Sequence, residues 1–95
     1  MIVKNDLYDY KNRMIFQDSS GFKFSLDSIL LAEFAKNIKN KSNVLDMCSG
    51  NCVVPLILST YNDANYVAFE IQKEIYNLGV KSIEYNKIKV MFLIL

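Results

Sequence analysis

Two acidic residues stand where their carboxylates could act on one ligand. Asp46 ends one apolar run and Glu70 ends the next, 20 positions after Gly50. The short loop 48–52 separates the two runs, and its glycine lets the backbone approach a ligand closely. Because parallel strands present their carboxyl ends along one edge of a sheet, we expect both acids at that edge.

Each group of this stretch would hold a different part of a ligand. Asp46 offers an acceptor to an ammonium group. The helix that we expect to begin near Cys52 or Val53 offers free N–H groups to a carboxylate or a phosphate. Glu70 is placed to accept both hydroxyls of a ribose. An ammonium group, a carboxylate and a ribose together describe S-adenosylmethionine.

Two other interpretations of the same stretch remain open on spacing alone. A dinucleotide site requires the pattern G-x-G-x-x-G, and here those positions are Cys48, Gly50 and Val53, so two of the three glycines are absent. The acid Asp46 at the end of the strand also suits a methyl donor better. The third interpretation is a strand, a turn and a helix that pack only for stability.

The cysteine and histidine content does not favour a metal site. The chain has two cysteines, Cys48 and Cys52, and no histidine. Structural zinc sites usually use four cysteine or histidine ligands, and no second pair exists here. We therefore expect no metal, and in a reducing compartment we expect no disulfide.

Composition limits the class of protein. The chain has 95 residues, 52% hydrophobic residues and a net charge of +1. These values suit one small domain, or a piece of a larger one, with a hydrophobic core and no global charge for nucleic acid binding. The basic residues Lys36, Lys39, Lys41 and the run 11–13 are interpreted as solvated surface. The apolar run 90–95 is too short to span a bilayer, so we expect no membrane contact.

The amino-terminal residues, 1–24, are predicted to form a β-rich lid. The runs 7–10, 13–17 and 22–24 are rich in β-forming residues, and turns are expected at 11–12 and 18–21. A helix follows, with Ser25 as its N-cap and Asp27 in its first turn. Its predicted apolar stripe consists of Leu26, Ile29, Leu30 and Phe34, broadened by Leu31 and Ala35.

The rest of the chain, 25–95, is predicted to be a partial S-adenosylmethionine-binding domain. Strands are expected at 43–47, 66–70 and 89–95, the last one buried on both faces. The helix after Cys52 is expected to pack on the sheet through Val53, Leu56, Ile57 and Tyr61. The helix 72–86 is expected to bury Ile71, Ile75, Leu78 and Tyr85. Gly79, which costs about 1 kcal/mol relative to alanine, would with Ser82 allow close packing.

The stretch Val44-Leu45-Asp46-Met47-Cys48-Ser49-Gly50-Asn51-Cys52-Val53-Val54-Pro55-Leu56 resembles the first motif of class I S-adenosylmethionine-dependent methyltransferases. More narrowly, it resembles the bacterial enzymes that methylate adenine N6 in the anticodon loop of a valine tRNA. The stretch 21–32, and Glu70-Ile71-Gln72 leading to 82–86, agree with that family. The resemblance implies an α/β, Rossmann-like fold, truncated here to about three parallel strands with helices and preceded by a small antiparallel β lid.

The resemblance also implies residue roles, cofactor and partner. The cofactor would be S-adenosyl-L-methionine, the partner a tRNA and the location the cytoplasm. The methionine end would be lined by Asp46, Cys48, Ser49, Gly50 and Asn51. Glu70 would hold the ribose, and Ile71 would lie beside the adenine. Phe24, Ser25 and Asp27 would cap the pocket, although for Asp27 a simple helix-end charge is an equal alternative.

The sequence departs from that family at three points. Cys52 stands where the family has the last glycine of the loop. The third predicted strand, 89–95, lacks the acid that reads the adenine amino group. The Asn-Pro-Pro-Tyr catalytic motif is absent, since Pro55 is the only proline. We therefore expect an amino-terminal portion with no catalytic residues of its own, inactive alone, and either complemented by a carboxyl-terminal half or serving as a non-catalytic interaction module.

Overall fold

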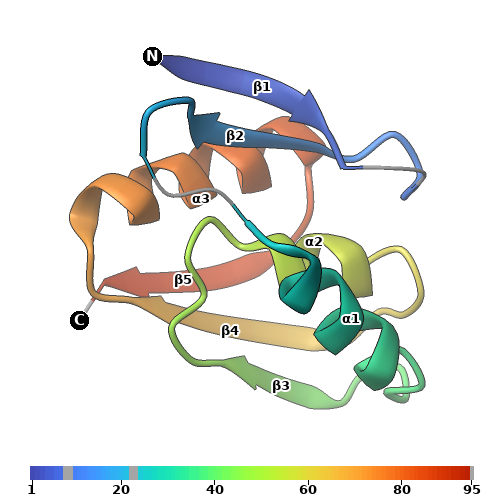
Figure 1. The fold of residues 1–95 in the computed structure, drawn as a ribbon. Coiled ribbons are helices and arrows are strands. Elements are labelled where there is room, and N and C mark those ends of the chain that lie inside the picture. Colours follow the sequence, from blue (N-terminus) through green and yellow to red (C-terminus); the bar gives the residue numbers. More distant parts are fainter. Residues whose placement is uncertain (8–9, 22–23, 95) are drawn as a thin grey trace.

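The computed structural model describes residues 1–7, 10–21 and 24–94. Figure 1 shows three layers: a strand hairpin, a layer of helices and a sheet. The hairpin consists of β1 (Ile2–Asp6) and β2 (Met14–Asp18), the helices are α1 (Leu26–Ala35), α2 (Val53–Leu58) and α3 (Lys73–Asn86), and the sheet consists of β3 (Asn43–Asp46), β4 (Asn65–Glu70) and β5 (Val90–Ile94).

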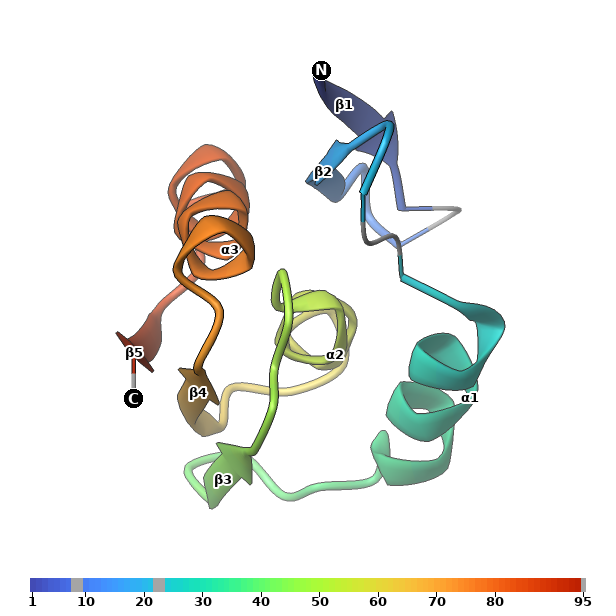
Figure 2. The same ribbon diagram turned by 60° about the vertical axis from the view of Figure 1, so that its left-hand side comes forward.

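The sheet has the predicted parallel arrangement. Its order is β3-β4-β5, and Leu45 on β3 pairs with Val67, which in turn pairs with Met91 on β5. Figures 1 and 2 show the described helices on one face of this sheet. β4 turns Tyr66 and Ala68 toward them, and both side chains are buried.

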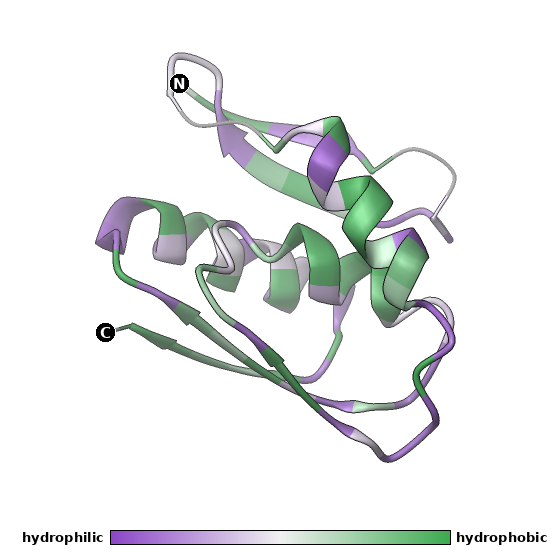
Figure 3. Ribbon diagram, turned by 60° about the horizontal axis from the view of Figure 1, so that its bottom comes forward, coloured by the Kyte–Doolittle hydropathy of each residue, from purple (hydrophilic) through white to green (hydrophobic). Residues whose placement is uncertain are grey.

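The prediction that the third strand is buried on both faces is wrong. β5 is hydrophobic along its whole drawn length in Figure 3, yet Met91 is 62% exposed, and Leu45, in the same register row on β3, is 59% exposed. The physical reason is that no described layer covers the outer face of the sheet. Apolar strand composition therefore predicted the strand but not its covering.

α2 lies at the centre of the helix layer and is almost entirely buried. Val53, Leu56 and Ile57 belong to the main core, as predicted, and Pro55 fits the first turn because its missing N–H has no partner to lose there. Tyr61 was expected in this core and is half exposed instead. The helix ends at Leu58, so Tyr61 lies in the following turn rather than on the buried face.

α1 buries a different face from the predicted one. Ala32 is fully buried, and Ile29 and Ala35 pack beside it on the core. The predicted stripe fails at four positions, because the exposed residues are Leu26, Leu30, Leu31 and Phe34. The helix is apolar nearly all round, and the face with the alanines allows the closest approach to α2.

α3 packs through its small residues, as predicted. Its buried residues are Leu78, Gly79, Ser82 and Ile83. A Cβ built on Gly79 would lie 2.3 Å from Cε2 of Phe92 and 3.3 Å from the carbonyl carbon of Asn51. Ile71 and Tyr85, also predicted to be buried, are exposed. Ile71 precedes the helix, and Tyr85 turns outward so that its ring stacks edge-on against Phe16.

The hairpin begins earlier than predicted. β1 occupies 2–6. The predicted strand at 7–10 falls partly on Tyr8 and Asp9, outside the described residues, and Leu7 and Tyr10 lie in no strand. The turn at Lys11 and Asn12 is confirmed by positive φ angles of 46° and 59°. The predicted strand at 22–24 falls partly on Phe22 and Lys23, outside the described residues, and Phe24 lies in no strand.

The hairpin is attached to α3 by hydrogen bonds from β2. The backbone N–H of Phe16 donates to Oγ of Ser82 at 2.9 Å, and the amide of Asn86 forms bonds of 2.8 and 2.6 Å with the N–H and C=O of Met14. Figure 2 shows the hairpin above α3. That residues 1–24 act as a lid stays a prediction.

Replacing Gly79 with alanine should destabilise the fold. Alanine gains about 1 kcal/mol of helix propensity, but overpacking a filled interface costs about 1–3 kcal/mol. Urea unfolding should therefore show a lower free energy for Gly79→Ala, with the exposed Asn77→Ala as the control. In a Phe92→Leu background the penalty should shrink. An alanine variant as stable as the parent would contradict the close packing seen here.

Candidate cofactor site at the strand tips

A small cavity of about 140 Å³ lies at the carboxyl end of β3. Its wall brings together six of the ten predicted site residues, namely Phe24, Asp46, Cys48, Ser49, Gly50 and Asn51. Ser28, Leu31, Met47, Val53 and Val54 complete the lining. Sequence reasoning missed the α1 contribution of Ser28 and Leu31, although a helix that starts beside the pocket was the available signal.

The loop 48–52, here called the donor loop, has an unusual backbone. Cys48, Gly50 and Cys52 adopt left-handed conformations with φ of 57°, 63° and 67°. Only glycine adopts such angles without a steric penalty, which for other residues is about 1–2 kcal/mol. The two cysteines therefore place strain in the loop that the surrounding contacts must offset.

Glu70 holds the donor loop in place. Its Oε1 accepts the N–H of Gly50 at 2.8 Å, and its Oε2 accepts the N–H of Gln72 at 2.9 Å. The side chain is only 6% exposed. The N–H of Ser49 donates to the carbonyl of Phe69 at 2.7 Å, which adds a second tie to β4. Glu70 thus supports the loop from behind and does not line the cavity.

Asp46 is the acidic group of the cavity. Burial raises the pKa of its carboxyl, and the hydroxyl of Ser49, which donates to Oδ2 at 2.6 Å, acts in the opposite direction. No cation lies within ion-pair distance of Asp46 among the salt bridges of the described residues. A half-buried carboxylate without a cation is suited to receive an ammonium group.

Asn51 is held from outside the cavity. It is fully buried, and its Nδ2 donates to the carbonyl of Phe16 on β2 at 3.2 Å. Gly79 of α3 lies against its backbone. The cavity therefore meets the backbone of Asn51, while its amide joins the loop to the hairpin. Cys48 is exposed at the cavity edge with a free thiol.

Cys52 fits its position without entering the cavity. Its side chain is fully buried and packs with Ala68 and Ile83, between the sheet and α3. Burial raises the pKa of its thiol to about 12, so the sulfur stays protonated at neutral pH. Cys52, which stands where the resemblance implies a glycine, thus has its sulfur on the sheet side of the loop. The free-energy cost of a cysteine here comes from the left-handed backbone conformation.

The remaining predicted residues lie around the cavity rather than in it. Ser25 has the N-cap position of α1 but makes no capping hydrogen bond through its side chain, and Asp27 is an exposed residue of the first turn. Ile71 is 71% exposed immediately after Glu70. Their cofactor roles stay predictions.

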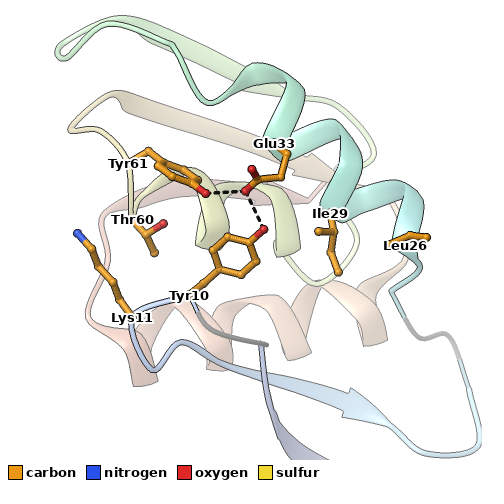
Figure 4. Close-up of a pocket in the computed structure, with 7 residues that line it drawn as sticks. All are labelled: Tyr10, Lys11, Leu26, Ile29, Glu33, Thr60 and Tyr61. Carbon is orange, nitrogen blue, oxygen red and sulfur yellow. Dashed lines mark hydrogen bonds between the residues drawn. The ribbon is translucent and has the colours of Figure 1, made fainter.

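A larger cavity of about 630 Å³ lies on the other side of α1 and contains none of the predicted residues. Figure 4 shows the carboxylate of Glu33 between the hydroxyls of Tyr10 and Tyr61, at 2.7 and 2.6 Å. Burial, followed by the bond to Glu33, raises the pKa of Tyr10 to about 12. These bonds join the loop 10–12 to α1 and to the end of α2, so we interpret the cluster as structural.

Two further features bear on the function. Within 1–7, 10–21 and 24–94, no three acidic, cysteine or histidine side chains gather as they would around a metal ion. In the same part of the chain, no helix has both the length and the apolar character needed to cross a bilayer.

The left-handed backbone of Cys52 gives an unusual substitution order. Both Cys52→Ala and Cys52→Gly remove the buried sulfur, but only glycine also removes the penalty of a positive φ. Glycine should therefore be more stable than alanine here by about 1 kcal/mol, the reverse of the ordinary order. Urea unfolding of the two variants measures this difference, and an alanine variant at least as stable as the glycine variant would contradict the described conformation.

Comparisons with known proteins agree with the geometry. No family model matches the chain. It is 27% identical over 79 residues to a tRNA1(Val) (adenine(37)-N6)-methyltransferase of Flavobacterium johnsoniae, covering 82% of this chain and 34% of that protein. A tRNA1(Val) (adenine(37)-N6)-methyltransferase of Christiangramia forsetii is 28% identical over 83 residues, covering 86% and 35%. The chain thus spans about a third of the length of these curated relatives.

Solved structures show the same fold. The Pyrococcus abyssi tRNA (uracil-54, C5)-methyltransferase in complex with S-adenosyl-L-homocysteine has a TM-score of 0.75 at 17% identity, covering 99% of this chain and 24% of that one. A protein-L-isoaspartate O-methyltransferase has a TM-score of 0.64 at 18% identity, covering 82% and 26%. The resemblance inferred from the sequence is confirmed: the chain is similar in sequence to part of the tRNA1(Val) adenine-N6 methyltransferases and has a Rossmann-like methyltransferase fold.

Proposed function

We propose that the donor loop and Asp46 bind the methionine end of S-adenosylmethionine, as part of a tRNA adenine-N6 methyltransferase. The observation that carries this proposal is the half-buried carboxylate of Asp46, without an ion-pair partner, in the wall of the strand-tip cavity. It would accept the ammonium group of the methionine moiety. The names of the curated relatives support the choice of tRNA, and the S-adenosyl-L-homocysteine in the structure of the Pyrococcus abyssi enzyme supports the choice of methyl donor. We propose a cytoplasmic location from the tRNA substrate.

The size of the cavity limits which part of the cofactor it holds. Sites for drug-sized ligands are about 300–1,000 Å³, and this cavity has about 140 Å³. It therefore suits the amino acid end alone. The adenosine would lie beyond the loop, where exposed Ile71 offers an apolar surface next to Glu70. Each carboxylate oxygen of Glu70 accepts one backbone N–H and keeps a second lone pair. A movement of the donor loop that exposes these oxygens would let them accept the ribose hydroxyls.

The chain supplies binding rather than turnover. Bound S-adenosylmethionine would supply an activated methyl group, and positioning would provide most of the rate acceleration. The residues described here fix the donor side only. The Asn-Pro-Pro-Tyr motif that would receive an adenine turned out of its stack is absent from these 95 residues. We therefore propose weak cofactor binding and no methyl transfer by the 95 residues alone.

Calorimetry with S-adenosylmethionine tests the role of Asp46. Asp46→Asn removes the negative charge and keeps an acceptor for Ser49, so the Kd should rise about tenfold or more. Asp6→Asn is the matched control, because Asp6 on β1 is exposed and lies outside the cavity. Equal affinity of Asp46→Asn and the parent chain would refute this site.

Asp46→Asn should bind the cofactor more weakly than the parent chain but be more stable to unfolding. Burial raises the pKa of Asp46 above its ordinary value of 3.8, so the folded state holds the proton more tightly than the unfolded state. The stability contributed by this group is present below 3.8 and is lost as the pH rises through the folded pKa. Asp46→Asn should therefore gain stability relative to the parent between acidic and neutral pH. A loss of stability would show that the binding defect reflects unfolding.

The uncovered sheet face favours a second candidate role, as one half of a two-chain enzyme. Leu45, Met91 and Leu93 are exposed along this face. Exposed apolar patches of this kind mark interaction sites. We propose that a separately encoded chain, corresponding to the part of the relatives that this chain does not match, covers it.

Light scattering tests this second role. The chain mixed with the unmatched part of a relative should form a one-to-one complex, and Met91→Lys should weaken it at least tenfold because a charge would be buried at the interface. Lys73→Met on the opposite, helical side is the control. No complex with the parent chain would contradict the two-chain proposal and leave the cofactor proposal unaffected.

A further inference from the structure

A third cavity opens at the opposite end of the parallel strands from the strand-tip cavity. It has a volume of about 410 Å³ and lies where β4 and β5 begin, with Arg13, Asn62 and Lys89 in its wall. The donor loop follows the carboxyl end of β3, so the sheet separates the two sites. None of the contacts that hold the donor loop involves this cavity, and the inference below does not rest on the proposed function.

Two buried hydrogen-bond donors of this cavity's residues lack acceptors. In the part of the chain that the structure describes, the buried side-chain atoms without a partner are Nε of Arg13 and Nδ2 of Asn62. The orientation of the Asn62 amide is fixed, because its Oδ1 accepts the N–H of Ala64 at 3.3 Å and the hydroxyl of Tyr66. A buried donor without an acceptor costs about 1–3 kcal/mol. Both atoms belong to residues that line one cavity, which indicates that an acceptor belongs there.

The cavity also has an excess of positive charge. Arg13 is half-buried, and its Nη2 donates to the neutral hydroxyl of Ser59 at 3.1 Å. Burial lowers the pKa of this guanidinium, because no described carboxylate compensates it. Lys41 and Lys89 line the same cavity, and Asp63, 2.5 Å from Lys41, is the carboxylate of the described lining. Three cations face one carboxylate.

We propose that this cavity binds an oxyanion of the phosphate class. Arg13 and Asn62 would donate hydrogen bonds to its oxygens, and Lys41 and Lys89 would supply charge at the mouth. A volume of about 410 Å³ leaves room for a group attached to the phosphate. The oxyanion could therefore be free phosphate or a phosphodiester of an RNA chain, and the experiment below separates these two sources.

Amide NMR of the full 95-residue chain, titrated with inorganic phosphate at constant ionic strength, tests the site. The signals of 59–66 and 88–89, and the Nε–H of Arg13, should shift to saturation while those of the donor loop stay unchanged. Arg13→Met should raise the Kd for phosphate about tenfold, since it removes a charge-assisted pair of donors. Arg13→Lys should recover part of the affinity.

A variant of the exposed Lys89 separates a loss of phosphate binding from a folding defect. Lys89→Met changes a surface residue, so it should keep the fold and still raise the phosphate Kd about threefold. Lys39→Met removes the same charge outside the cavity and should leave the Kd unchanged. Absence of saturable shifts in the parent chain, or equal effects of Lys89→Met and Lys39→Met, would overturn the proposal and identify water as the acceptor.

Measurements of tRNA binding by the same variants identify the source of the oxyanion. If the site takes an RNA phosphodiester, Lys89→Met should weaken tRNA binding and reduce the dependence of log K on log salt by about one unit, whereas Lys39→Met should not. If phosphate binds but both variants bind tRNA equally, the site serves a small phosphate compound. Either result supports the site, and it is overturned only by the phosphate titration.

Discussion

The strand-tip site depends on the two hydrogen bonds that the carboxylate of Glu70 accepts. One oxygen accepts the N–H of Gly50 and the other accepts the N–H of Gln72, so one buried side chain joins the donor loop to the start of α3. A carboxylate that accepts backbone N–H groups forms hydrogen bonds about twice as strong as neutral ones. Without the bond to Gly50, the donor loop would lose one of the two hydrogen bonds described above that join it to β4, the other being from the N–H of Ser49 to the carbonyl of Phe69.

The other supports of the loop come from elements far apart in the sequence. Gly79 brings α3 against the backbone of Asn51, and the amide of Asn51 reaches β2 at Phe16. These contacts offset the left-handed strain at Cys48 and Cys52. The arrangement leaves Asp46 in the wall of the cavity, while Glu70 accepts N–H groups of the loop and of Gln72. That both acids also act on one ligand stays a prediction.

Sequence patterns predicted the parts of the fold in which composition and position agree. The strand-turn-helix around Gly50, the strand that ends at Glu70 and the close packing of Gly79 were predicted because small residues, apolar runs and acids mark them directly. The buried face of α1 was missed because the leucines of this helix lie on its exposed side, whereas its two alanines pack on the core. The bonds of Glu70 were missed because a strand-end acid has the same sequence signature whether it faces a ribose or a loop.

The place where S-adenosylhomocysteine binds on this chain is the most direct test of the strand-tip site. Amide NMR during titration with S-adenosylhomocysteine should shift the signals of 46–51 to saturation and leave those of 59–66, at the other end of the strands, unchanged. That result would place the ligand on the donor loop beside Asp46. Loop signals that do not move, or shifts confined to the distant cavity, would contradict the assignment of the strand-tip site.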